Sequence, residues 1–292
     1  GKMLKKNEMY GLTMVFIGAV LWSTLSLFVK IADMDVYLFT ALRYAVAAVF
    51  LLPFAFKGGI PFNRDLVMFV VSYVLLGITL VLAIVYTANA IAVGMQFTAP
   101  LWVFVYDYLR GQRLAKKNLL PLAMILIGLL VFMLTPGKGV TWYGNLLALF
   151  SGILFGLLTI FSARVKTDNP IGLTGIGNFI GAVSMFICYL CFGGSWGDLA
   201  DISALQWAEV LFIGIFQTAG GFTLFNIGLK YADTQKASVI STMELVGSVI
   251  LVAVFLQEYP DIYSILGSLF IIIGIVGQFI FAKQESKVLL QE

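Results

Sequence analysis

The amino-acid sequence predicts an all-α integral membrane protein, in which ten transmembrane helices form two inverted five-helix repeats and both termini are cytoplasmic. Composition is the first reason. Hydrophobic residues make up 61% of the chain and charged residues 11%, against roughly 45–50% and roughly 25% in soluble domains. The other two reasons are the lengths of the apolar segments and the distribution of basic residues between them.

Ten apolar segments reach the roughly 20 residues that a helix needs to cross the hydrocarbon core. They lie at 9–31, 36–56, 65–87, 90–110, 117–136, 142–164, 170–193, 206–230, 235–257 and 262–282. Polar or turn-forming residues separate most neighbours, as at Lys57–Asp65, Gly111–Asn118 and Gly193–Ser203. The boundary near Asn89 has the weakest signal of this kind. No polar tract is long enough for a soluble domain, so the sequence predicts one membrane domain.

Basic residues collect in alternate connections, and this predicts the orientation of the spans. With a cytoplasmic N-terminus, the inside segments contain Lys5, Lys6, Lys57, Arg64, Arg110, Arg113, Lys116, Lys117, Arg164, Lys166, Lys230, Lys236, Lys283 and Lys287. The outside segments contain only Lys30 and Lys138, and Arg43 lies within a span. A wrong number of spans would destroy this alternation, so the positive-inside rule supports ten spans with both termini inside. The predicted location is the inner (plasma) membrane of the cell.

Matched landmarks predict an internal repeat. Tyr86, Thr98 and Gln112 correspond to Tyr231, Met243 and Gln257, each 145 residues further along the chain. The predicted units are a first repeat at 3–138, a second repeat at 139–284 and a cytoplasmic tail at 285–292. An odd number of spans per repeat inverts the second copy in the bilayer. Inverted repeats with a substrate site between them are typical of secondary transporters, which work by alternating access.

Short motifs in the predicted spans suggest a family. They are Trp22-Ser23 followed by Lys30, Arg43 within Ala41-Leu42-Arg43-Tyr44, Thr98-Ala99-Pro100-Leu101, and Glu244 followed by Glu258. Over essentially the whole chain, this pattern resembles the ten-span EamA family of the drug/metabolite transporter superfamily. The chain departs from the usual family pattern at Ser23, at Leu245 and at Gln112-Arg113, where a glycine, a proline and an acidic residue are usual.

The resemblance implies a secondary transporter of small metabolites, often an exporter, that does not hydrolyse ATP. It also implies a central cavity lined by spans one to four and six to nine, with spans five and ten at the periphery.

Charged residues within the spans are the first candidates for the site, because a charge at the bilayer centre costs about 2.5–3.5 kcal/mol on insertion scales. Glu244 lies near the middle of its span and is predicted to bind substrate and to carry a coupling proton; the alternative is a structural hydrogen bond. Arg43 either binds a substrate carboxylate or phosphate, or snorkels outward and holds helices together. Asp107 is predicted to form an internal ion pair or gate beside the basic segment that begins at Arg110.

Aromatic and neutral polar side chains complete the predicted substrate site. The aromatic candidates are Trp22, Tyr44, Trp102 and Phe222, which suit a cage around an ammonium group. The neutral hydrogen-bonding candidates are Gln96, Asn178, Gln217, Thr218 and Asn226. Each of these side chains has the alternative of ordinary packing or of a hydrogen bond between helices.

Several classes of function are excluded or set aside by the sequence. It has no Gly-rich loop ending in Lys-Ser or Lys-Thr. It also has no histidine, so it contains no histidine-based catalytic triad or histidine metal site. We therefore expect no catalytic residues, no metal, no cofactor and no nucleic-acid partner. The expected partners are a small-molecule substrate, the lipid bilayer and protons as the coupling ion, and the expected oligomeric state is a monomer or a weak homodimer. The glycines of the last span, Gly267, Gly274 and Gly277, suit a tight helix contact either in such a dimer or within the chain.

Two substrate hypotheses follow from these residues. The first is a zwitterion such as an amino acid, whose amine faces Glu244 and whose carboxylate faces Arg43. The second is an organic cation, such as a choline-like amine, held by Glu244 and aromatic rings. The first requires that both charges line one cavity, which depends on the tertiary structure. A membrane protein with a structural or signalling role is the remote alternative.

Overall fold

The computed structural model describes residues 7–291, and within this range the chain is helical and has no strand. Among the described residues, nine single or consecutive helices are long and apolar enough to cross a membrane: Glu8–Ala32, Val36–Ala55, Arg64–Tyr86, Asn89–Leu109, Trp142–Arg164, Pro170–Cys191, Ala204–Tyr231, Thr234–Leu256 and Ile262–Glu285. They coincide with nine of the ten predicted spans. The remaining predicted span, 117–136, corresponds to α8 (Lys116–Phe132), which has 17 residues and falls short of the roughly 20 of a full span.

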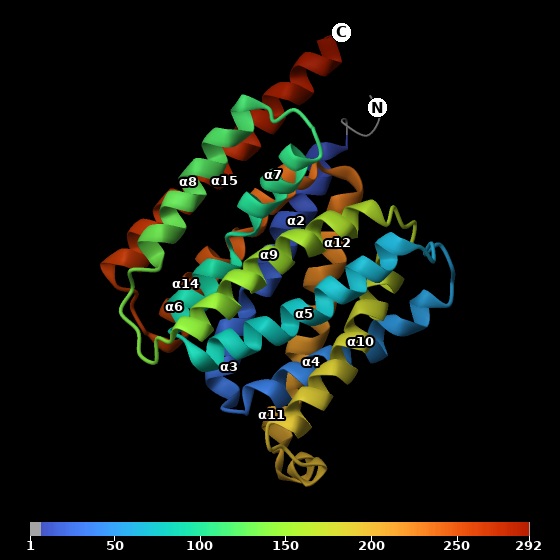
Figure 1. Cartoon of the computed structure of the whole chain (residues 1–292), viewed down its shortest axis with the longest axis vertical. Helices are drawn as coiled ribbons and strands as arrows, with labels where there is room; N and C mark the ends of the chain where they lie inside the picture. The colour runs from blue at the N-terminus through green and yellow to red at the C-terminus, as the bar shows by residue number, and fades with distance from the viewer. Residues whose placement is uncertain (1–6, 292) are drawn as a thin grey trace.

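The helices run between two ends of one bundle (Figure 1). At the end where the described chain begins and ends, here called the terminal end, lie α2 (Glu8–Trp22) and the last turns of α15 (Ile262–Gln291). The opposite or far end carries the connection with the short 3₁₀ helix η1 (Trp196–Asp201) and the start of α11 (Ala204–Phe212). Helix α15 continues to Gln291, so the described part of the predicted tail is helical.

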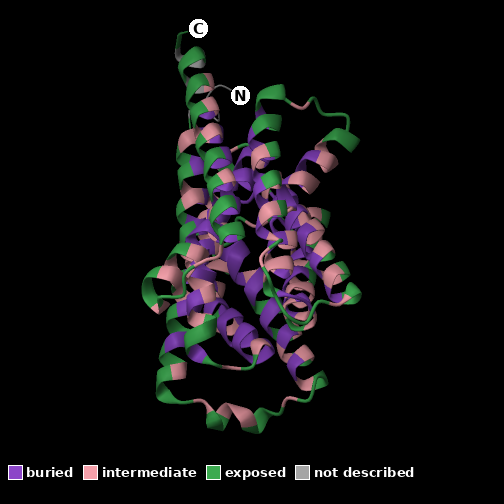
Figure 2. Ribbon diagram, turned by 90° about the vertical axis from the view of Figure 1, so that its left-hand side faces the viewer, coloured by how far each residue is buried: buried purple, intermediate pink, exposed green. Residues whose placement is uncertain are grey.

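Close helix pairs build the bundle. Helix α4 (Val36–Ala55) packs against α10 (Pro170–Cys191), α5 (Arg64–Tyr86) against α9 (Trp142–Arg164), and α2 against α12 (Gly221–Tyr231). Buried residues follow the inner faces of these helices, and exposed residues face outward (Figure 2). Many exposed residues are large and apolar, such as Val49, Val254 and Phe255, as expected of a surface in contact with lipid rather than water.

Helices α8 and α15 form a separate pair at the edge of the bundle (Figure 1). A Cβ atom added at Gly267 would lie 2.6 Å from the carbonyl oxygen of Gly128, and one at Gly128 would lie equally close to the oxygen of Gly267. The two backbones therefore touch at these glycines. The contact expected of the glycines in the last span is thus made at Gly267 within the chain itself.

Three of the spans are interrupted by a short break. Helix α2 gives way to α3 (Thr24–Ala32) at Ser23, α6 (Asn89–Gln96) to α7 (Ala99–Leu109) at Thr98, and α13 (Thr234–Ser241) to α14 (Met243–Leu256) at Thr242. At each break the hydroxyl donates a hydrogen bond to the carbonyl three residues earlier. Hydroxyls that bond back in this way compete with the helical ladder and bend the helix.

Candidate functional site

A small cavity lies at the centre of the bundle, with an enclosed volume of about 40 Å³. Its walls come from seven spans and consist of Trp22, Leu25, Arg43, Tyr44, Leu76, Gly77, Leu80, Gln96, Phe155, Gln217, Phe222 and Glu244. The volume accommodates only a few water molecules, whereas small-molecule sites have roughly 300–1,000 Å³. A solute therefore reaches these residues only when the walls move apart.

Arg43 is the buried cation of the cavity and lies on α4, with 6% of its surface exposed. Its Nη1 donates a hydrogen bond of 3.2 Å to Thr218 Oγ1, and its guanidinium carbon lies 4.5 Å from the ring centre of Tyr44. Thr218 in turn donates to Gln217 Oε1 at 2.6 Å. The Nε atom of Arg43 is buried and has no hydrogen-bond partner. One donor of the guanidinium thus remains available beside the cavity.

A wide helical turn places Gln217 and Thr218 next to Arg43. The segment η2 (Ile213–Gly220), between α11 and α12, has the geometry of a π-helix. Such segments are rare and occur frequently at functional sites, because the extra residue per turn redirects side chains. Here the wide turn presents two consecutive polar side chains, both buried, toward α4 and α2.

Glu244 provides the opposite charge on the cavity wall. It lies in the first turn of α14, directly after the break at Thr242, where the helix dipole favours a negative group. Among the ion pairs of the described residues, none joins Glu244 to Arg43. The cavity thus contains an acid and a base that line the same space and are not neutralised by direct contact.

Aromatic rings form the third part of the wall. The Trp22 ring centre lies 4.7 Å from that of Phe222 and 6.0 Å from that of Phe155. The indole Nε1 of Trp22 is buried and has no hydrogen-bond partner. Trp22 fits there because position 221 is glycine, where an added Cβ atom would lie 2.3 Å from Trp22 Cδ1. An indole donor and aromatic faces therefore lie beside the charged groups.

Seven of the eleven candidate substrate-binding residues line this cavity: Trp22, Arg43, Tyr44, Gln96, Gln217, Phe222 and Glu244. Thr218 is not in the wall but accepts a hydrogen bond from Arg43. The other three do not line the cavity. Trp102 donates to Thr98 Oγ1 at 3.0 Å, Asn178 accepts a hydrogen bond of 2.7 Å from Tyr73, and Asn226 donates to Thr174 Oγ1 at 2.9 Å. These three side chains take part in hydrogen bonds within the helix bundle.

Asp107 lies away from the cavity, at the terminal end of α7. Its Oδ2 accepts a hydrogen bond of 2.6 Å from Gln235 Nε2 on α13. Asp107 takes no part in the ion pairs of the described residues, so the predicted internal ion pair is replaced by a hydrogen bond between two spans.

Other cavity residues are absent from the sequence prediction. They are Leu25, Leu76, Gly77, Leu80 and Phe155. All are apolar residues in apolar spans, and such a residue looks the same in sequence whether it faces lipid, core or cavity. Among these five residues, Gly77 has a structural requirement for its residue type: an added Cβ atom would lie 2.9 Å from the hydroxyl of Tyr44.

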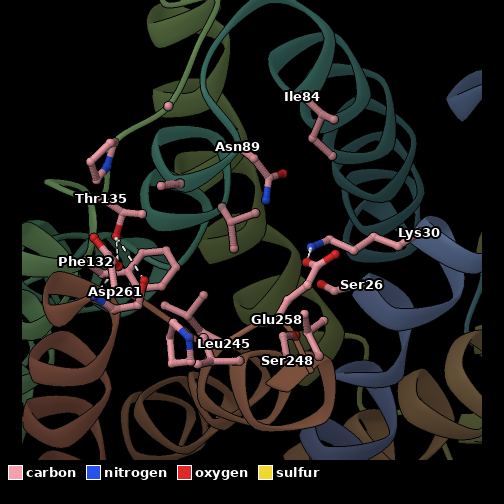
Figure 3. A pocket seen from close by; sticks show the side chains of 18 of the residues that line it. Ser26, Lys30, Ile84, Asn89, Phe132, Thr135, Leu245, Ser248, Glu258 and Asp261 are labelled. Carbon is pink, nitrogen blue, oxygen red and sulfur yellow. Dashed lines mark hydrogen bonds and ion pairs between the residues drawn. The ribbon is translucent and has the colours of Figure 1, made fainter. Parts of the chain in front are cut away.

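A much larger cleft, of about 760 Å³, opens at the far end. Figure 3 shows the side chains that line it. Asn89 and Val93 of α6 line one wall, and Leu245 and Ser248 of α14 line another. An ion pair between Lys30 and Glu258 crosses it. Leu245 adjoins Glu244 in sequence, so the cleft reaches the level of the central cavity. A contact of 3.3 Å between Ser248 Oγ and the carbonyl oxygen of Ser23 lies beside it.

A bundle of membrane-spanning helices with a charged internal cavity and a cleft leading toward it defines a membrane transporter rather than an enzyme. The particular family follows from comparison with known proteins. The model of the EamA-like transporter family matches residues 9–134 and 142–280, and the chain belongs to this family.

Individual relatives agree with this assignment. An uncharacterized transporter of Archaeoglobus fulgidus is 29% identical over 271 residues, which cover 91% of this chain and 95% of the relative. A biotin transporter of Salmonella typhimurium is 22% identical, with 85% of this chain and 86% of the relative covered. A crystal structure at 20% identity has the same fold, with a TM-score of 0.78 over 94% of this chain and 98% of the other.

Proposed function

We propose that the protein is a secondary active carrier of a small zwitterionic metabolite such as an amino acid. It works by alternating access through the central cavity, as an exporter or as a proton-linked exchanger. The observation that supports this substrate class is that Arg43 and Glu244 line one cavity. A zwitterion satisfies both groups at once: its carboxylate accepts from Arg43 and Trp22, and its ammonium group donates to Glu244.

The proposed topology has ten spans, with α8 as the fifth. Hydrogen bonds join the connection after α4 to the connection after α9 at the terminal end, through Asn169 and the carbonyls of Phe54 and Gly58. Most basic residues between the spans belong to connections at this end, and Lys30 and Lys138 belong to the other. The positive-inside rule then favours a cytoplasmic terminal end in the inner (plasma) membrane.

The two inverted repeats are supported by the bounds of the interrupted spans. Helix α6 covers Asn89–Gln96 and helix α13 covers Thr234–Ser241. The first residues of the two helices are 145 positions apart, and so are their last residues, which is the offset between the matched sequence landmarks. The family model also matches twice, once in each proposed repeat. In an inverted repeat these two half-helices lie at opposite ends of the bundle, on the two sides of the central cavity.

An organic cation is the second candidate substrate. Tyr44, Phe155, Phe222 and Trp22 share the cavity with Glu244, and aromatic faces attract a desolvated cation by roughly 2 kcal/mol or more. The buried guanidinium of Arg43 in the same cavity disfavours this class, because two positive charges would then face one carboxylate. The zwitterion avoids this imbalance.

Flux measurements with two variants of Arg43 separate the two substrate classes. A thermal-shift screen of amino acids and organic amines first identifies a ligand of the purified protein, since binding to the folded state raises apparent stability. Flux of that ligand is then measured in liposomes containing the unaltered chain, Arg43→Gln or Arg43→Lys. For a zwitterion, Arg43→Gln raises the half-saturating concentration at least tenfold and Arg43→Lys restores part of the loss. Unchanged affinity in Arg43→Gln would refute the zwitterion, and absence of solute flux in the unaltered chain would refute the carrier function.

A further inference from the structure

The short helix α13 has an unusual combination of composition and burial. All seven residues from Gln235 to Ser241 are buried, and four of them are polar. The hydroxyl of Ser238 is fully buried and has no hydrogen-bond partner. Buried polar groups in a membrane protein usually face a partner or a water-filled path. Here α13 forms the part of the Glu244 span that lies toward the terminal end, and it packs against α2, α7 and α15.

Helix α6 has the corresponding position in the first repeat, but its surroundings differ. Asn89, Ala90 and Val93 line the open cleft at the far end. With the offset of 145 residues, Ala90 and Val93 correspond to Gln235 and Ser238, which are buried. Helices α6 and α13 therefore occupy corresponding positions in the two repeats but lie in different environments. Helix α6 lines a cleft, whereas α13 is buried by its neighbours.

Polar contacts hold the first turn of α13 to three other helices. Lys236 Nζ lies 2.7 Å from Glu8 Oε1 of α2 and 2.5 Å from Glu285 Oε2 of α15. The preceding residue, Gln235, donates to Asp107 of α7 at 2.6 Å. The side chains of Lys236 and Glu8 are 6% and 8% exposed, so their attraction is only weakly screened by water.

We propose that α13 is a mobile plug, that is, a segment that closes the central cavity from the terminal end. The ion triad Glu8–Lys236–Glu285, here called the lock, holds α13 in this closed position. In the opposite conformation the triad separates, α13 swings away from α2 and α15, and Gln235 and Ser238 line a water-filled cleft at the terminal end. The cleft at the far end closes on α6 at the same time. The inference rests on the proposed alternating access, but it does not depend on the class of substrate.

Removing the central charge of the triad weakens the lock for a simple reason. Lys236→Gln leaves Glu8 and Glu285 close together without a cation, and two carboxylates that share a site repel one another. The equilibrium then shifts toward the conformation in which they are apart. Lys236→Arg keeps the cation, so it retains the lock. Glu285→Gln is a milder change, because Glu285 is 34% exposed and the pair of Lys236 with Glu8 remains.

The matched positions in the two half-helices provide the test. Cys188 and Cys191 are replaced by serine, and single cysteines are introduced as Ser238→Cys or Val93→Cys. The full chain in lipid nanodiscs is labelled with a charged maleimide, and both labelling rates are measured with and without the lock variants. Lys230→Gln is the control, because Lys230 forms an exposed ion pair of 3.7 Å with Asp168 that belongs to neither half-helix.

The expected result is reciprocal. With the lock intact, labelling is fast at position 93 and slow at position 238. Lys236→Gln raises the rate at 238 at least tenfold and lowers the rate at 93; Glu285→Gln changes both rates in the same directions by less, and Lys236→Arg and Lys230→Gln change neither. General unfolding would raise both rates and would overturn the lock. So would a slow rate at 238 in every variant, or a faster rate at 238 without a slower one at 93. If such a result accompanies normal solute flux, the plug fails and the carrier function stands.

Discussion

Arg43 and Glu244 line one cavity, although they come from helices α4 and α14 and form no direct ion pair. The unpaired arrangement is functionally informative, because two opposite charges at hydrogen-bonding distance would neutralise each other and leave little affinity for a charged solute. Arg43 is held by Thr218 and by the ring of Tyr44, and Glu244 lies in the first turn of α14. Under the proposed function, this arrangement suits a ligand with two charges.

Replacement of Glu244 by glutamine tests the coupling role. Among the cavity residues, Glu244 is the one carboxylate, and the proposed proton coupling assigns the coupling proton to it. We expect Glu244→Gln to abolish accumulation of the solute driven by a pH gradient, while exchange between equal solute concentrations retains part of its rate. Undiminished proton-driven accumulation in proteoliposomes would show that the coupling proton binds elsewhere.

Substitution of Gly221 tests the packing that positions Trp22. A Cβ atom at Gly221 would lie 2.3 Å from Trp22 Cδ1, so Gly221→Ala must displace the indole from the cavity wall. Overpacking of this kind costs about 1–3 kcal/mol, and we expect a large loss of flux with it. Gly220→Ala is the control, because its nearest contacts are at 3.4 Å. Equal flux in the two variants would exclude a role for the position of Trp22.

The contact between α8 and α15 predicts a variant that affects stability and not the site. Gly267→Ala places a Cβ atom 2.6 Å from the oxygen of Gly128 and forces the two helices apart. We expect a lower melting temperature, equivalent to about 1–3 kcal/mol, with the half-saturating concentration for solute unchanged. Gly277→Ala, whose nearest contact is at 3.9 Å, should leave the melting temperature unchanged. An unchanged melting temperature together with loss of an oligomer in Gly267→Ala would instead assign this face to a dimer.

The connection between α10 and α11, which contains η1, should become less stable in acid. Hydrogen bonds from the Tyr189 hydroxyl and from the Ser195 backbone lower the pKa of Asp198 below its ordinary value of 3.8. The folded connection therefore favours the carboxylate, so its stabilising effect is present above that ordinary value and is lost as the pH falls through the lowered pKa. The protection factors of residues 195–201, which correct for the intrinsic pH dependence of amide exchange, should fall in that range. Asp198→Asn should remove this fall; protection factors that still fall with pH in this variant would contradict the assignment.

Sequence reasoning locates the charged site residues because the bilayer makes them costly. Glu244 and Arg43 are visible as charges within apolar segments, and seven of the predicted binding residues lie around the cavity. Phe155 is not visible in this way, since one phenylalanine among 25 carries no signal of its own. Asn178 and Asn226 look the same in sequence as the polar residues that line the cavity, and only the tertiary structure shows their hydrogen bonds with Tyr73 and Thr174.

The sequence by itself determined that this chain is a helical membrane protein, where most of its spans lie, and which residues bring charge into them. Those properties follow from the apolar length and the transfer energy of each segment, which are local. Only the tertiary structure decided that Arg43, Gln217 and Glu244 line one cavity, that α6 lines a cleft and that α13 is buried. These relationships depend on packing between helices far apart in the chain, where a wide turn at Ile213–Gly220 and a single glycine such as Gly221 set which side chains face one another.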